Sequence, residues 1–126
     1  MDKNRQIIST TKWTPEVILD PKGIIKLTGR LIPENAEGFF KPIEEWVKEY
    51  FKNPAEITCF EISLEYINSA GTKYLVYLIH KITNIHLKTR KLIINWYYKE
   101  EDEDMLEKWT FFSSNFDVPF NFIKVI

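Results

Sequence analysis

Apolar and polar residues change their spacing several times along the 126-residue chain, and each change predicts a new element. Between Thr58 and Ile67 the two kinds alternate, which is typical of a strand with one buried and one polar face. The residues expected to face the core there are Phe60, Ile62, Leu64 and Tyr66. Shorter apolar segments predict further strands over residues 16–20, 24–28, 91–98 and 120–126.

Helical spacing fills the intervals between these strands. One stripe predicts an amphipathic helix that enters at Asn35 and ends before Pro54; it consists of Phe39, Ile43, Trp46, Val47, Tyr50 and Phe51. Proline lacks an amide donor, so Pro42 is expected in the first turn of this helix or at a kink. Two further helices are expected over residues 69–88 and from 101 to about 115.

The predicted order is therefore β-β-α-β-α-β-α-β in an α/β fold, with residues 1–14 irregular or forming an edge strand. The strand–helix–strand unit over 58–98 predicts two parallel strands in one mixed sheet. Polar residues on the outer face of the strand at 58–67, together with Asn95 and Tyr97, indicate that helices cover mainly one face. We expect one domain over residues 1–126, because two would each be too small for a good core.

Composition and charge exclude several classes of function. Hydrophobic residues make up 44% of the chain and the formal net charge is −1, so a packed core is expected and nucleic-acid binding is not. Apolar segments are too short for a membrane span or a signal peptide. A single cysteine, Cys59, leaves no intramolecular disulfide. We expect a cytoplasmic protein that binds no cofactor and does not insert into a membrane.

Residues that could carry catalysis or hold a metal are poorly arranged for either. His80 and His86 are six residues apart, so they lie on different helix faces and cannot form a zinc-binding pair. Cys59 is typical of a packing residue in a strand. The acidic run at residues 100–104 could bind a cation or a small ligand, but a solvated helix start explains it better. We therefore expect no enzymatic activity.

One segment, residues 66–73, combines a strand end and a helix start within a few residues. Asn68 and Ser69 are both residue types that cap helix N-termini. A phosphate on Ser69 would also suit this position, because it adds about −1.5 to −2 charge beside free amides and the positive helix end. Lys73, one turn further, is expected to pair with it. Residue chemistry alone favours a simple cap over a phosphorylation site.

The same segment resembles a known regulatory turn. The run from Asn68 through Ser69 to Gly71 is similar to the Asp-Ser-Ser-Gly turn of STAS-domain anti-anti-sigma factors, with Asn68 in place of the usual acid. Those proteins are small α/β domains in which a partner kinase phosphorylates the serine. The resemblance implies a STAS-like fold with Ser69 as the modified residue.

Across nearly its whole length the chain also resembles the SiaC family of bacterial regulatory phosphoproteins. The matching segments follow one another in the family's order and comprise residues 11–15, 33–36, 39–42 with Trp46, 64–68, 95–98 and 101–107. The family's usual phosphosite, a threonine after the asparagine of the turn, falls on Ser69. Thr72 is a weaker candidate, and Ala70 and Gly71 replace the family's later hydroxyls.

This resemblance implies a non-enzymatic regulator. A dedicated Ser/Thr kinase would add the phosphate and a PP2C-type phosphatase would remove it. The unphosphorylated form would bind and activate a diguanylate cyclase, promoting cyclic-di-GMP synthesis and biofilm formation. The family-motif residues expected at the partner surface are Pro33, Glu34, Asn35, Trp96 and Tyr98.

The chain departs from the family pattern at Arg30–Ile32 and at Lys108–Trp109, which bears on the identity of the partner. A second interpretation stays open, in which the chain is a plain interaction or dimerisation module and Ser69 only a cap. The oligomeric state is also open.

Overall fold

The computed structural model describes residues 4–86 and 88–125. The elements, in chain order, are β1 (Gln6–Ile8), β2 (Glu16–Asp20), β3 (Ile24–Leu31), α1 (Ala36–Tyr50), β4 (Ile57–Ile67), α2 (Ser69–Ile85), β5 (Lys91–Lys99), α3 (Glu103–Ser113) and β6 (Phe120–Val125). None of the described helices is both long enough and apolar enough to span a bilayer.

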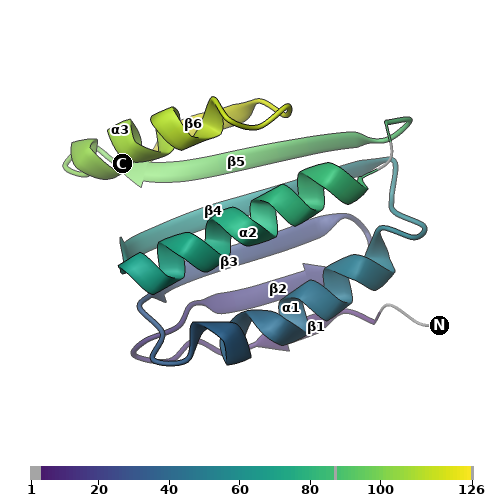
Figure 1. Ribbon diagram of the computed structural model, residues 1–126, viewed down its shortest axis with the longest axis horizontal. Helices are drawn as coiled ribbons and strands as arrows, with labels where there is room; N and C mark the ends of the chain where they lie inside the picture. Colours follow the sequence, from purple (N-terminus) through teal and green to yellow (C-terminus); the bar gives the residue numbers. More distant parts are fainter. Residues whose placement is uncertain (1–3, 87, 126) are drawn as a thin grey trace.

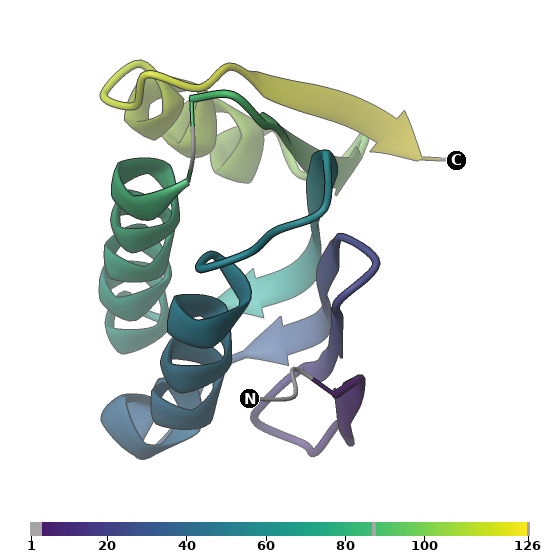
Figure 2. The same ribbon diagram turned by 90° about the vertical axis from the view of Figure 1, so that its right-hand side faces the viewer.

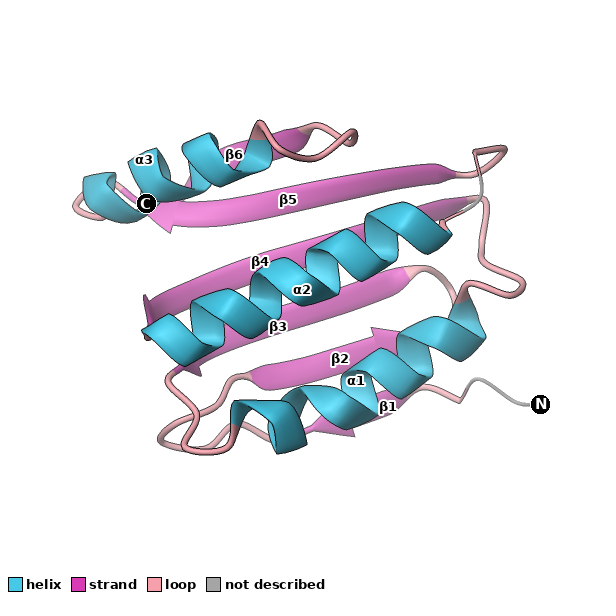
Figure 3. Cartoon of the chain, viewed as in Figure 1, coloured by secondary structure: helices cyan, strands magenta, loops and turns pink. Residues whose placement is uncertain are grey.

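The strands form one six-stranded sheet in which spatial order equals sequence order, from β1 to β6 (Figure 1). β1, β2 and β3 are antiparallel to one another, whereas β3, β4, β5 and β6 run parallel. Along the chain, one helix connects each pair of consecutive parallel strands (Figure 3). The predicted α/β class, mixed sheet and parallel pair at 58–98 are confirmed, while the STAS-like assignment stays a prediction.

All three helices pack on the same face of the sheet (Figure 2), as the polar outer positions predicted. The core lies between the two layers and contains large side chains that are fully buried, including Trp96, Trp109, Tyr50, Phe40 and Phe60. The predicted stripe on α1 is shifted slightly, because Phe40 is fully buried and Phe39 only half-buried.

The face without helices carries a polar network across β4, β5 and β6. The carboxylate of Glu61 accepts hydrogen bonds from Asn95 Nδ2 at 2.7 Å and from the Tyr97 hydroxyl at 2.5 Å. Asn121 Nδ2 donates to Asn95 Oδ1 at 3.0 Å, which extends the network to the edge strand. Partners on three strands satisfy one another, so this face tolerates polar residues without a covering layer.

Tyr97 is expected to lose its proton only at very high pH. Its hydrogen bond to the Glu61 carboxylate, with smaller effects of burial and of the Glu61 charge, raises the pKa of Tyr97 to about 12. Because the folded-state pKa is raised, the stabilisation is present below the unfolded pKa near 10 and is lost as the pH rises through about 12. An ultraviolet titration of wild type and Tyr97→Phe should show one late phenol missing from the variant. An unchanged titration would contradict this assignment.

Tyr66 is the clearest departure from the predicted strand faces. It was expected to face the core, yet its exposed fraction is 60%. The pairing register explains this: Gly29 pairs with Leu64 but Arg30 pairs with Tyr66, so β4 has one extra residue at Glu65. Such a bulge reverses the alternation beyond it. Ile67 therefore takes the core-facing position and Tyr66 points outward.

Element boundaries differ from the predicted ones at several points. α2 ends at Ile85 instead of Lys88, and residue 87 lies outside the described residues. α3 begins at Glu103, two residues later than predicted. Pro42 lies in the second turn of α1 on its exposed side, so the first-turn alternative was wrong and a kink at Pro42 stays a prediction.

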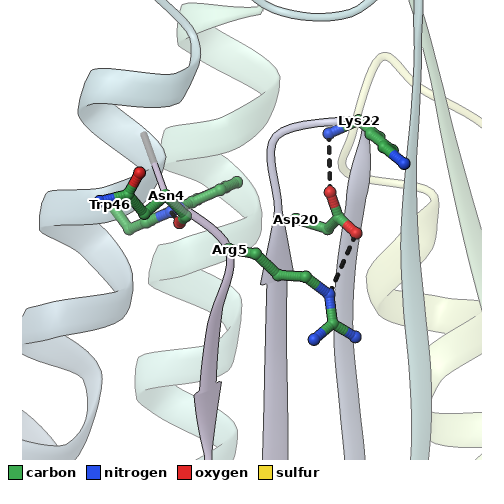
Figure 4. Close-up of polar contacts among 5 residues, drawn as sticks. All are labelled: Asn4, Arg5, Asp20, Lys22 and Trp46. Atoms are coloured by element: carbon green, nitrogen blue, oxygen red, sulfur yellow. Dashed lines mark hydrogen bonds and ion pairs between the residues drawn. The ribbon is translucent and has the colours of Figure 1, made fainter. Parts of the chain in front are cut away.

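The N-terminal segment, predicted as irregular or an edge strand, includes β1 at the sheet edge; residues 1–3 lie outside the described part. Trp46 Nε1 on α1 donates to the carbonyl of Asn4 at 2.9 Å. Asp20 accepts from Arg5 Nε at 3.3 Å and from the amide of Lys22 at 2.9 Å (Figure 4). These contacts hold β1 against α1 and the β2–β3 turn.

Candidate phosphorylation site at the β4–α2 junction

The junction between β4 and α2 is organised by Asn68. This residue is extended, with φ −88° and ψ 178°, and its Oδ1 accepts from the amide of Gly71 at 2.7 Å. Its carbonyl accepts from the amide of Thr72 at 2.9 Å, which is the first helical hydrogen bond. Asn68 is therefore the N-cap, and Ser69 is the first helical residue.

The end of β3 holds this junction in place. The amide of Asn68 donates to the carbonyl of Leu31 at 3.1 Å. Gly71 is buried, and a Cβ added there would lie 2.6 Å from the Leu31 carbonyl oxygen. α2 can approach β3 this closely because residue 71 has no side chain.

The two candidate hydroxyls differ sharply in access. Ser69 and Ala70 are exposed, and their amides precede the first helical hydrogen bond, at the positive end of α2. Thr72 has an exposed fraction of 9%, and its Oγ1 accepts from Lys108 Nζ at 3.3 Å. An enzyme that modifies a side chain must reach its hydroxyl, so the geometry favours Ser69 over Thr72.

The cation predicted to lie beside Ser69 points elsewhere. Lys73 Nζ lies 5.9 Å from the centroid of the Tyr77 ring, one turn further along α2. Lys108 of α3, which sequence reasoning did not assign to the site, contacts the first turn of α2 instead. The only sequence signal for it was its place in the segment that departs from the family pattern.

Four of the five family-motif residues predicted at a partner surface fall into two groups. Glu34 and Asn35 are exposed, and Asn35 caps α1 by accepting from the amide of Gly38 at 3.1 Å. Pro33 and Trp96 are buried, so their placement at the surface was wrong. Trp96 stacks on Trp109 with ring centroids 4.3 Å apart, because it occupies a core-facing position of β5.

Tyr98 is half-buried and lines an open cavity of about 390 Å³ at the carboxyl ends of β4 and β5. The outward turn of Tyr66 forms another part of the cavity wall, and Arg30 lies over its ring at 5.5 Å. Lys99 and Glu101 add charges of both signs. This mixture selects no particular ligand charge.

The remaining candidates have structural partners. His80 packs on Phe116 with ring centroids 4.5 Å apart, and His86 Nδ1 lies 3.1 Å from the carbonyl of Thr83. Burial, followed by the charge of Glu61, raises the pKa of the Cys59 thiol, which disfavours a reactive thiolate. In the acidic run, Glu100 pairs with Lys124 at 3.0 Å. Within residues 4–86 and 88–125, no cluster of histidine, cysteine and acidic residues could hold a metal ion.

Comparison with known proteins shows which chains this one is similar to over most of its length. An uncharacterized protein of Pseudomonas aeruginosa strain UCBPP-PA14, PA14_02130, is 23% identical over 114 residues, which is 90% of each chain. The SiaC chain in a crystal structure of the diguanylate cyclase SiaD with its activator SiaC, from Pseudomonas aeruginosa, is 21% identical. It superposes with a TM-score of 0.87, covering 95% of this chain and 99% of that one.

A structure of SiaC of Pseudomonas aeruginosa superposes with a TM-score of 0.85 at 20% identity, covering 97% of this chain and 99% of that one. These likenesses establish a shared fold. The family model described as SiaC family regulatory phosphoprotein matches residues 8–125. Because that match spans almost the entire chain, the protein belongs to the SiaC family of regulatory phosphoproteins.

Proposed function

We propose that this chain is a non-enzymatic, cytoplasmic, single-domain regulator whose binding to a protein partner is controlled by phosphorylation of Ser69. The observation that carries the proposal is the exposed Ser69 hydroxyl at the start of α2, in a member of a regulatory phosphoprotein family. A Ser/Thr kinase would transfer the γ-phosphoryl group of ATP to Ser69 Oγ, releasing ADP and a proton. A PP2C-type phosphatase would hydrolyse the phosphoester with water, restoring the hydroxyl and releasing inorganic phosphate.

The partner we propose is a diguanylate cyclase, bound while Ser69 is unphosphorylated. Support comes from the fold shared with SiaC, which activates the diguanylate cyclase SiaD. The output would then be synthesis of cyclic-di-GMP. If the bound protein is a different signalling enzyme, the assignment of a diguanylate cyclase is wrong, but the proposed control by Ser69 is unaffected.

The surface proposed to meet the partner continues from Ser69 along the exposed side of α2. Tyr77 on this side has an exposed fraction of 52%. Between α1 and α2 lies an open groove of about 500 Å³, with Tyr74, Lys41 and Lys81 among its lining residues. Glu37 and Glu44 line the groove as well, and Glu44 pairs with Lys81 at 3.0 Å. Exposed tyrosines beside a groove are suited to a protein interface, because aromatic residues are enriched there. A phosphate at Ser69 would place about −1.5 to −2 charge at one end of this surface and oppose docking.

The proposal predicts a phosphorylated fraction that depends on Ser69. The full chain, purified from its native organism, should show the added mass of one phosphate, mapped to residues 67–73. Ser69→Ala should abolish this fraction, whereas Thr72→Val, the matched control in the same turn, should retain it.

Two results would contradict the proposed switch. Labelling that persists in Ser69→Ala would move the site to another residue. A chain that is unmodified in every growth phase, yet still binds its partner, would favour the plain interaction module in which Ser69 is part of a helix start only.

A further inference from the structure

Lys108 links α3 to the first turn of α2. Its Nζ donates to Thr72 Oγ1 at 3.3 Å, across 36 residues of sequence. The adjacent Trp109 is the buried side chain of α3, and Met105 and Phe112 pack against the core only in part. Within residues 4–86 and 88–125, no carboxylate lies within ion-pairing distance of Lys108. Its charge is therefore unpaired beside the candidate phosphorylation site.

The Lys108 ammonium group is within reach of a phosphate on Ser69. Ser69 and Thr72 are three residues apart in one helix, so their Cβ atoms are about 5–6 Å apart. The lysine stem is flexible and already reaches the Thr72 hydroxyl. Lys73, the rival cation, has its Nζ over the Tyr77 ring on the following turn. Asp104 and Glu107 belong to the same helix as Lys108, and their negative charges would oppose a phosphate held by α3.

We propose that Lys108 binds the phosphate on Ser69, so that phosphorylation fastens α3 to the start of α2. The inference rests on the proposed function, in which Ser69 carries the phosphate. The ammonium group donates charge-assisted hydrogen bonds to the phosphate oxygens, which are stronger than its present bond to the neutral Thr72 hydroxyl. The modification thus acts on a second helix as well as on the charge of the α2 surface.

The second pKa of the phosphate reports this contact directly. Phosphoserine is incorporated at position 69 of the full chain during synthesis, and the phosphorus NMR shift is followed against pH. A neighbouring ammonium group stabilises the phosphate dianion. The second pKa of the phosphate should therefore be about half a unit lower in wild type than in Lys108→Met. Lys108→Arg should keep the low value, and Lys73→Met should change it less. Equal values in wild type and Lys108→Met, or a larger effect of Lys73→Met, would overturn the inference.

Hydrogen exchange of α3 gives a second readout. Phosphoserine at position 69 should increase the protection of amides 103–113 in wild type and leave it unchanged in Lys108→Met. Lys108 is exposed, so the variant is expected to fold, and the near-ultraviolet signal of the stacked tryptophans verifies this. If phosphoserine at position 69 leaves the protection of these amides unchanged in wild type, the claim that phosphorylation fastens α3 is contradicted.

This inference and the proposed function can fail separately. The phosphate here is installed without a kinase, so the titration tests Lys108 alone. A lowered pKa together with an unmodified chain in the native organism would uphold the Lys108 contact and refute the cellular switch. If Ser69 is phosphorylated in the organism but Lys108→Met leaves the second pKa of the phosphate unchanged, the cellular switch is upheld and the Lys108 contact is refuted.

Discussion

Replacing Trp109 with alanine is expected to lower the free energy of unfolding by about 3–5 kcal/mol. Trp109 is fully buried, stacks on Trp96 and contacts the Phe112 ring edge-on with centroids 5.2 Å apart. It is the buried residue of α3, so its loss leaves a large cavity and releases the helix from the sheet. Urea unfolding followed by circular dichroism measures the change.

Phe111 provides the matched control on the same helix. Its exposed fraction is 69%, so Phe111→Ala is expected to change stability by no more than about 0.5 kcal/mol. Similar losses in the two variants would contradict the assignment of Trp109 as the anchor of α3.

A phosphate on Ser69 is expected to weaken activation of the partner cyclase by about a hundredfold. An uncompensated charge in an interface costs several kcal/mol, and each 1.4 kcal/mol is tenfold in affinity. One ammonium group does not fully neutralise a phosphate of about −1.5 to −2 charge, so the Ser69 phosphate with Lys108 beside it stays net negative. The measurement is the rate of cyclic-di-GMP formation by diguanylate cyclases of the same organism, titrated with unmodified and with phosphoserine-69 chain.

Phosphoserine at position 114 is the control for added charge alone. Ser114 is exposed at the end of α3, at the opposite end of that helix from the acidic run. This form should activate the cyclase as well as the unmodified chain does. Equal loss with phosphate at either position would contradict a specific role of Ser69.

Most of the fold was predictable because long elements have strong periodicity. The alternation in β4 and the helical spacing of apolar residues in α2 leave little ambiguity about the type of either element. β1 was ambiguous because it is three residues long and mostly exposed. The outward turn of Tyr66 could not be predicted, since a bulge depends on the pairing between two strands.

The candidate site was only partly predictable for a related reason. Asn68 caps α2 through a neighbour in sequence, so residue types sufficed to find the helix start. The prediction of Ser69 as a phosphorylation site came from the family resemblance. Whether the cap was Asn68 or Ser69 required the backbone geometry. Lys108 reaches the site from another helix, and no local pattern marks such a contact. Trp96 was predicted at the surface because it belongs to a family motif, yet it is buried. A family motif contains core residues as well as surface residues, so membership in it does not predict exposure.

Competition for the partner tests the central claim, control of binding by one phosphate at Ser69, most directly. Equal amounts of the unmodified and phosphoserine-69 chains are mixed with a limiting amount of a diguanylate cyclase that the unmodified chain activates. Intact mass then gives the ratio of the two forms in the bound fraction. We predict that the unmodified form exceeds the phosphorylated form by about a hundredfold. Equal amounts of the two forms in the bound fraction would contradict the switch.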